Sequence, residues 1–225
     1  MRISSLARLV IIRLLVTAVA WAGLVQAASS VYDFYLVSLE GKSVPLKQYD
    51  GKVLLIVNLA TKTEYKDQIP KLELLYEKYE PQGLVVIGVP SNDFGAGQPE
   101  KPGEIQQAYA SYKLKFPLFG KSAVTGKEQI PLYAFITGSK KSGDVKSEVK
   151  DEGEKKDASP TAGEVPWNFT KYLTDRKGKP IARFDADVAP DSPELTVAIE
   201  EALNAKPGAG DKETEKAGRE VVRAR

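Results

Sequence analysis

Two apolar segments with an amphipathic segment between them constrain the fold of this chain more than any other feature. Residues 53–57 and 84–89 are continuous apolar runs rich in β-branched side chains, a pattern typical of strands buried on both faces. Between these runs, apolar residues recur at helical spacing over 65–79, and Pro70 requires that helix to begin close to it. A strand, a helix and a strand within about 35 residues predict a right-handed βαβ unit with a parallel strand pair.

A second pair of strands is expected later in the chain. Residues 169–174 and 180–184 flank the polar segment 175–179, in which Gly178 can adopt the left-handed backbone of a tight turn. Because the strands of a hairpin are antiparallel, the sheet is expected to be mixed.

Helical spacing over 104–112 and 193–204 predicts two further helices. Ser192 is a suitable N-cap for the second of them, and Pro193 fits its first helical position. Together these elements predict an α/β fold in which helices flank a central mixed sheet.

The N-terminal segment 1–27 has the organisation of a secretory signal peptide. Three arginines precede the apolar run 14–25, and small residues follow at the cleavage positions. The run is shorter than the roughly 20 apolar residues that span a bilayer, although an uncleaved anchor is the alternative. We therefore expect an exported protein, periplasmic or extracellular, that is free of the membrane after cleavage.

Two segments have a composition that does not favour folding. Residues 138–164 and 205–225 mix Lys, Glu, Asp, Ser and Gly with few apolar side chains. Such segments bury too little surface to offset the entropy of ordering. We expect one domain over 28–204, interrupted by a charged flexible insertion and followed by a disordered tail.

The composition also limits the chemistry. The chain has no Cys and no His, and its one methionine is Met1, which excludes disulfides, thiolate nucleophiles, imidazole bases and the usual zinc or haem ligands. No metal and no cofactor is expected. Loss of the three arginines in 1–27 would leave 29 of the 32 basic residues against 30 acidic ones, a net charge of −1. A nucleic-acid partner is not expected, since such binding needs clustered basic charge.

Three motifs resemble those of the glutathione peroxidase family and occur in the same order. Residues 58–63, Asn-Leu-Ala-Thr-Lys-Thr, resemble the family's Asn-Val-Ala-Ser-x-Cys (or selenocysteine) signature. Residues 84–95 resemble the strand and turn that contain Phe-Pro-Cys-Asn-Gln-Phe-Gly, and 167–173 resemble Trp-Asn-Phe-x-Lys-Phe-Leu. The resemblance covers residues 31–203. It implies a thioredoxin-like fold whose reactive position lies at the start of a helix that follows a central strand.

The resemblance also implies which residues form the site. Thr63 occupies the position of the nucleophilic Cys or selenocysteine, and the residues around it correspond to Gln98, Trp167 and Asn168. A peroxide and a small thiol are the implied ligands. A hydroxyl stays protonated at neutral pH and has no sulfenic-type oxidation state, so threonine cannot replace the chalcogen. We therefore expect a non-catalytic exported member of the family.

Three of these residues also have a purely structural interpretation. Thr63 can be the N-cap of the helix that follows it. Trp167 can be a core aromatic, and Asn168 a turn residue that bonds to nearby backbone. Residues 168–170 also match a glycosylation sequon, a short pattern with little weight.

Two other functions remain open at this point. One is an active thiol-dependent peroxidase with an unrecognised mechanism. The other is carboxylate-assisted hydrolysis by Glu64 and Asp93, which replace a Gly and a Gln of the family's motifs. A carboxylate at position 64 would also disfavour an anion beside it.

Overall fold

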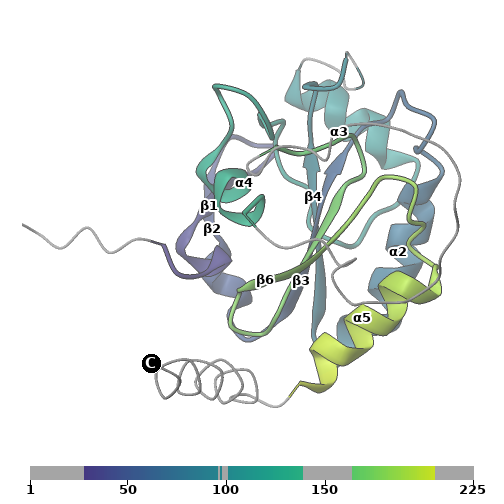
Figure 1. Ribbon diagram of the computed structural model, residues 1–225. Coiled ribbons are helices and arrows are strands. Elements are labelled where there is room, and N and C mark those ends of the chain that lie inside the picture. The colour runs from purple at the N-terminus through teal and green to yellow at the C-terminus, as the bar shows by residue number, and fades with distance from the viewer. Residues whose placement is uncertain (1–27, 96, 98–100, 139–163, 206–225) are drawn as a thin grey trace, which may run out of the picture.

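The computed structural model describes residues 28–95, 97, 101–138 and 164–205 (Figure 1). The predicted signal peptide, Gln98, nearly all of the charged insertion and nearly all of the tail lie outside the described residues. The predictions on those segments therefore stay predictions.

A four-stranded mixed sheet forms the centre of the fold, with the strand order β4-β3-β5-β6. Strand β3 pairs in parallel with β4 and antiparallel with β5, which in turn pairs antiparallel with β6. The strands span β3 (Val53–Leu59), β4 (Leu84–Pro90), β5 (Lys171–Thr174) and β6 (Pro180–Phe184). The predicted α/β class with a mixed sheet is confirmed.

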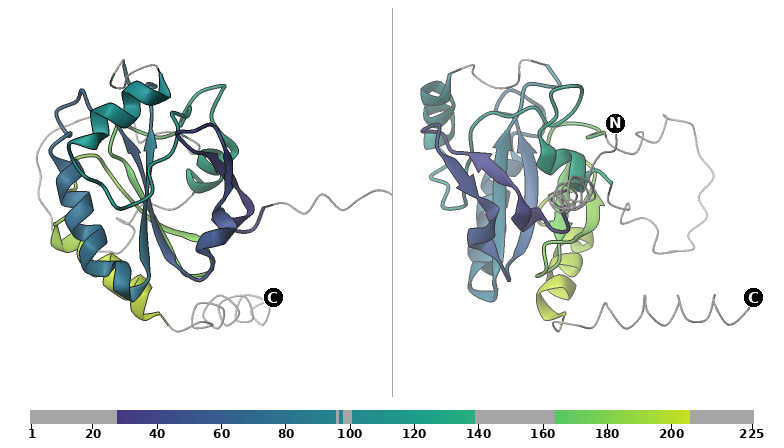
Figure 2. Two further views of the ribbon diagram at one scale, coloured as in Figure 1. Left: turned by 180° about the vertical axis from the view of Figure 1, so that it is seen from behind. Right: turned by 90° about the vertical axis from the view of Figure 1, so that its left-hand side faces the viewer.

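Helices cover both faces of this sheet. One face packs against α2 (Gln68–Tyr79) and α5 (Pro193–Asn204), which lie on the same side of the molecule (Figures 1 and 2). The other face packs against α4 (Pro131–Ile136) and the short 3-10 helices η1 (Val31–Asp33) and η2 (Leu46–Tyr49). Successive side chains of β3 point to opposite faces of the sheet and so contribute to both hydrophobic cores. Leu55 and Leu59 belong to the first cluster, and Leu54 and Ile56 belong to the second.

The predicted βαβ unit is present, but its helix begins later than the sequence pattern suggested. A turn occupies residues 64–67, and α2 starts at Gln68. Pro70 is then the third helical residue, where its missing N–H removes no intrahelical bond. After α2, the 3-10 helix η3 (Glu80–Gln82) ends at Gly83, whose φ of 103° is left-handed.

The second hairpin is also confirmed, with a shorter first strand than expected. Gly178 in its turn has a φ of 74°, and a Cβ there would lie 2.4 Å from Oγ of Ser30. Strand β5 begins at Lys171 rather than at 169, because Phe169 has a φ of 63° and cannot continue an extended strand.

The helix predictions differ in accuracy. Helix α5 has the predicted bounds, and the Ser192 side chain accepts a hydrogen bond from the backbone N–H of Leu195 as its cap. Helix α3 spans Pro102–Ala110 instead of 104–112. Neither α4 nor the antiparallel pair β1 (Tyr35–Val37) and β2 (Ser43–Pro45) was predicted, because these elements are too short to show a periodicity.

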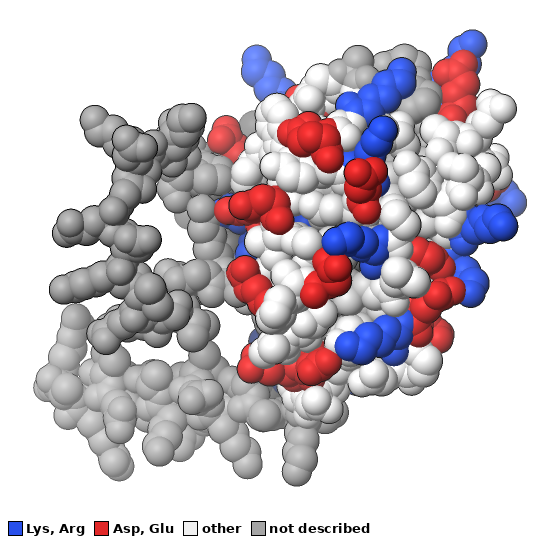
Figure 3. Space-filling model, turned by 90° about the vertical axis from the view of Figure 1, so that its right-hand side faces the viewer, with Lys and Arg blue, Asp and Glu red and all other residues white. Residues whose placement is uncertain are grey.

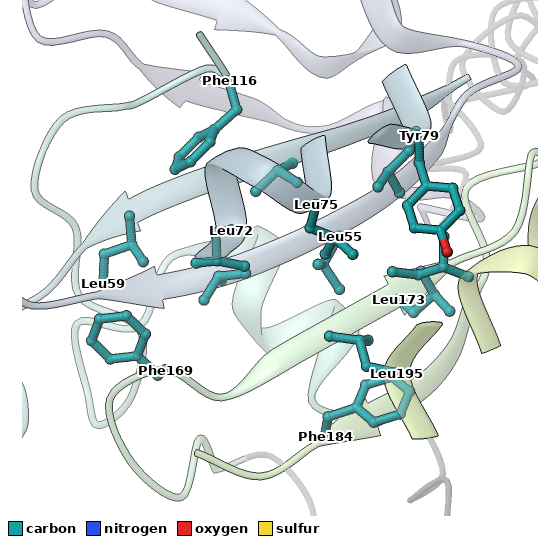
Figure 4. Close-up of a cluster of buried hydrophobic side chains, with 14 of the residues drawn as sticks. Leu55, Leu59, Leu72, Leu75, Tyr79, Phe116, Phe169, Leu173, Phe184 and Leu195 are labelled. Carbon is teal, nitrogen blue, oxygen red and sulfur yellow. The ribbon is translucent and has the colours of Figure 1, made fainter. Parts of the chain in front are cut away.

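The larger hydrophobic cluster extends to the end of β3 and includes Phe169, in the segment before β5. Figure 4 shows Leu59 and Phe169 next to each other at one end of the larger cluster.

Basic and acidic side chains are interspersed on the face drawn in Figure 3. Two ion pairs link α2 to α5 and the segment before it, Lys71 with Asp191 and Lys78 with Glu200.

Within the described ranges, no helix is long and apolar enough to cross a membrane.

Candidate active site

The candidate site lies where β3 ends, and two hydrogen bonds fix the segment before β5 against it. The backbone N–H of Phe169 donates to the Asn58 carbonyl over 2.8 Å. In return, Nδ2 of Asn58 donates to the Trp167 carbonyl over 3.1 Å. Asn58 is fully buried, so these bonds are shielded from water and position Trp167 beside the chain that leads to Thr63.

The turn that carries Trp167 is braced on its other side as well. The hydroxyl of Thr170 donates to the Trp167 carbonyl over 2.8 Å. The ammonium of Lys171 donates to the Phe169 carbonyl over 2.9 Å. The left-handed backbone of Phe169 costs about 1–2 kcal/mol for a non-glycine residue, and these bonds offset that cost.

Thr63 lies in the turn between β3 and α2, and not at the helix terminus. Its hydroxyl donates to Oε2 of Glu64 over 3.0 Å and accepts from the Tyr65 backbone N–H over 3.5 Å. The N-cap of α2 is Asp67, whose side chain makes no capping bond. The N-cap interpretation of Thr63 is therefore wrong, because the hydroxyl stabilises the preceding turn instead.

Trp167 is a surface residue, with 43% of its area exposed. Its ring packs against Phe94 with centroids 5.4 Å apart, and its side chain lies near enough to the Glu64 carboxylate to help lower the pKa of that group. The interpretation as a core aromatic is wrong, since the residue connects two loops at the mouth of the site.

Asn168 is buried, with only 3% of its area exposed. It lies in a turn, as expected, and its Oδ1 accepts no hydrogen bond from the described residues. Because the side chain is buried, its position in the fold does not resemble an accessible glycosylation acceptor.

The Glu64 carboxylate is the charged centre of the site. Hydrogen bonds from its own backbone N–H, from the Thr63 hydroxyl and from the Trp167 side chain lower its pKa below the ordinary value. The carboxylate is therefore ionised at neutral pH. The lowered pKa makes it a poorer general base for the Thr63 hydroxyl that it binds.

Asp93, the other acidic replacement, has a structural role. Its Oδ2 accepts from the backbone N–H groups of Val124 and Thr125, the latter over 3.1 Å. In the described part of the chain, no contact joins this carboxylate to Glu64. The hydrolytic hypothesis, which needs the two acids to act on one substrate, gains no support.

Gly97, the described residue that precedes Gln98 in the sequence, lies close to the site. It accepts through its carbonyl from the backbone N–H groups of Thr61 and Lys62, each over 3.0 Å. A Cβ at Gly97 would lie 3.0 Å from that of Ala60, so a close approach favours glycine there.

Comparison with known proteins identifies the family. A sequence model described as glutathione peroxidase matches residues 31–137. A glutathione peroxidase homolog of Neisseria meningitidis is 37% identical over 175 residues, which cover 74% of this chain and 97% of the relative. The chain belongs to the glutathione peroxidase family. A hydroperoxy fatty acid reductase of Synechocystis is 35% identical and covers 79% of this chain and 98% of its own length.

Solved structures agree with the family and the fold. GPX1 of T. cruzi superposes with a TM-score of 0.58 at 26% identity, and covers 79% of this chain and 98% of its own. Trgpx in its apo form gives a TM-score of 0.57 at 29% identity, with 80% and 98% covered. A thioredoxin-family thiol:disulfide interchange protein of Chlorobium tepidum, at 16% identity and a TM-score of 0.50, has the same fold. The thioredoxin-like fold is thus confirmed.

Sequence reasoning missed the polar residues that hold the site together. Asn58 interrupts an otherwise apolar strand, and Lys171 interrupts the other motif strand, so both were visible as polar residues at buried positions. A buried polar side chain needs partners, and this requirement was the signal that could have assigned them a positioning role.

Proposed function

We propose that this chain is a non-catalytic glutathione peroxidase family member that is exported from the cytoplasm. The observation that carries the proposal is threonine at position 63 in a chain without any cysteine. By resemblance, position 63 is where the family has its chalcogen nucleophile.

The chemistry of the family requires that chalcogen. A thiolate attacks one peroxide oxygen, the O–O bond breaks, and the other oxygen leaves as an alcohol or water after taking up a proton. The sulfur gains an oxygen as sulfenic acid, and two thiols restore it while forming a disulfide and water. A threonine oxygen has no corresponding oxidised state, so the sequence closes this route.

The surroundings of Thr63 support the proposal. Its hydroxyl proton is directed to the Glu64 carboxylate, whose lowered pKa makes it a weak base. The absence of cysteine also removes any resolving thiol. Neither a direct nucleophile nor a local relay is available to reduce a peroxide.

A binding role fits what the site retains. Trp167 and Phe94 present tilted, partly exposed rings in contact with each other beside polar groups, the usual composition of a small-molecule site. By family resemblance, the ligand would be an organic hydroperoxide or a small thiol. The apolar part of such a ligand would contact the rings.

The test compares hydroperoxide consumption by purified wild-type protein, by a heat-treated sample and by Thr63→Ala, with a thiol reductant present. We expect three equal rates. A wild-type rate above that of the heat-treated sample would overturn the non-catalytic assignment and favour an active peroxidase with an unrecognised mechanism. A loss of that excess in Thr63→Ala would place the activity at this site.

A further inference from the structure

The exposed Glu64 carboxylate already occupies a hydrogen-bond donor at position 63. The Thr63 hydroxyl donates to its Oε2 over 3.0 Å. Interactions with its own backbone, with the Thr63 hydroxyl and with the Trp167 side chain lower the pKa of this carboxyl group. A donor that could stabilise a negatively charged reactant is thus directed at a residue of the chain itself.

The charge of Glu64 acts in the same direction as this occupancy. A fixed negative charge within a few ångströms disfavours a second anion. None of the ion pairs among the described residues contains Glu64, so no salt-bridged Lys or Arg cancels this effect. Asp93, the other carboxylate of the motif region, is held by the backbone of the 124–125 segment. Among the residues described in contact with Thr63 and Trp167, Glu64 is therefore the one that carries a negative charge.

We propose that Glu64 is a specificity-determining residue whose carboxylate fills the anion position of this site and excludes anionic reactants. The inference rests on the proposed function, because it concerns the same site and predicts that the site favours neutral over anionic ligands. It adds a second barrier to peroxide chemistry, which would persist if a thiol were returned to position 63. A thiol there would remain protonated, and a protonated thiol is not the nucleophile.

The first experiment probes the native site without any cysteine. The full chain has two tryptophans, so Trp21→Phe leaves Trp167 as the sole tryptophan fluorophore. Quenching by iodide, an anion, is compared with quenching by neutral acrylamide, in the presence and absence of Glu64→Gln. Glutamine keeps the size of the side chain and an acceptor for Thr63, and removes only the charge.

We expect Glu64→Gln to raise the iodide quenching constant about twofold, as removal of one nearby screened charge would, and to leave acrylamide quenching unchanged. Glu201→Gln, an exposed site on α5 with the same change in net charge, is the matched control and should alter neither constant. Equal iodide constants with and without Glu64→Gln would overturn the proposal. An equal rise in both quenchers would do so too, because it would indicate loosened packing rather than charge.

The second experiment places a thiol at position 63. Thr63→Cys introduces the only cysteine of the chain, so the pH dependence of iodoacetamide alkylation reports that thiol alone, as the S–C bond forms and iodide leaves. We expect a thiol pKa above the ordinary value of about 8.5, and a fall of about one unit, or tenfold more thiolate at neutral pH, when Glu64→Gln is added. The control pair carries Glu201→Gln instead. Equal pKa values for the thiol in the two backgrounds, with Glu64 retained or replaced, would overturn the proposal.

Each of the two proposals can be refuted without refuting the other. Peroxide consumption by the wild-type chain would remove the non-catalytic assignment and leave the quenching result intact. Unchanged iodide quenching would remove the role of Glu64 and leave the peroxidase result intact. Circular dichroism and melting of each variant confirm that a fold is present before either result is interpreted.

Discussion

Lys171 should make the stability of this protein depend on pH in a range where few other groups titrate. The residue has no exposed area, and among the described residues its ammonium bonds to the carbonyls of Phe169 and Ala186, over 2.9 and 3.5 Å. Burial lowers its pKa from 10.5 to about 7, although Asp187 and Asp185 act against this shift. The folded protein therefore releases a proton that the unfolded chain keeps.

The sign and size of the effect follow from this difference. Between the folded pKa near 7 and the unfolded value of 10.5, the unfolded chain binds one more proton, so the free energy of unfolding rises with pH. The slope approaches 1.4 kcal/mol per pH unit, which gives a gain of about 2 kcal/mol between pH 7 and pH 9. Below pH 7 the ammonium is charged in both states, and the penalty of burying it is fully present.

Urea denaturation of wild type and Lys171→Met at pH 6, 7, 8 and 9, followed by circular dichroism, measures this gain. Methionine has a similar length and no charge, so the variant should lose the pH-dependent term, and wild type should gain on it by about 2 kcal/mol from pH 7 to 9. Lys127→Met, at an exposed position, is the control and should follow wild type. Parallel curves for wild type and Lys171→Met over this range would show that Lys171 keeps an ordinary pKa in the folded protein.

Three further predictions use other assays. Asn58→Ala should lower the free energy of unfolding by about 0.5–1.5 kcal/mol, because it removes the hydrogen bond from Nδ2 to the Trp167 carbonyl, and an unchanged urea midpoint would contradict this. Gly178→Ala should lower the melting temperature, since its φ is 74° and its Cβ would meet Ser30, whereas Gly103→Ala in α3 meets nothing within 4 Å and should not. Sequencing of the exported protein should show that 1–27 has been removed, and its retention in a membrane fraction would favour an anchor.

The sequence predicted the parts of the fold that depend on long, regular patterns. The apolar runs at 53–57 and 84–89 became β3 and β4, and Ser192 and Pro193 placed the start of α5 correctly. Short elements such as β1 have three residues and show no period, so they could not be predicted.

The site was predicted less completely, for a physical reason. Family motifs brought attention to Thr63 and Trp167, but the interaction of Trp167 with Glu64 joins loops that are far apart in the chain. Such a contact depends on the fold and leaves no local pattern. The expectation that Thr63 caps a helix failed for a related reason, since the turn at 64–67 delays α2 to Gln68.

A peroxidase fold that lacks the family's nucleophilic sulfur or selenium should consume no peroxide until a sulfur is introduced at position 63. Initial rates of hydroperoxide consumption are therefore measured for wild type and for Thr63→Cys combined with Glu64→Gln, under identical thiol reductant. We expect a wild-type rate equal to that of a heat-treated sample and a higher rate for the double variant. Wild-type consumption above the heat-treated sample would contradict the non-catalytic assignment.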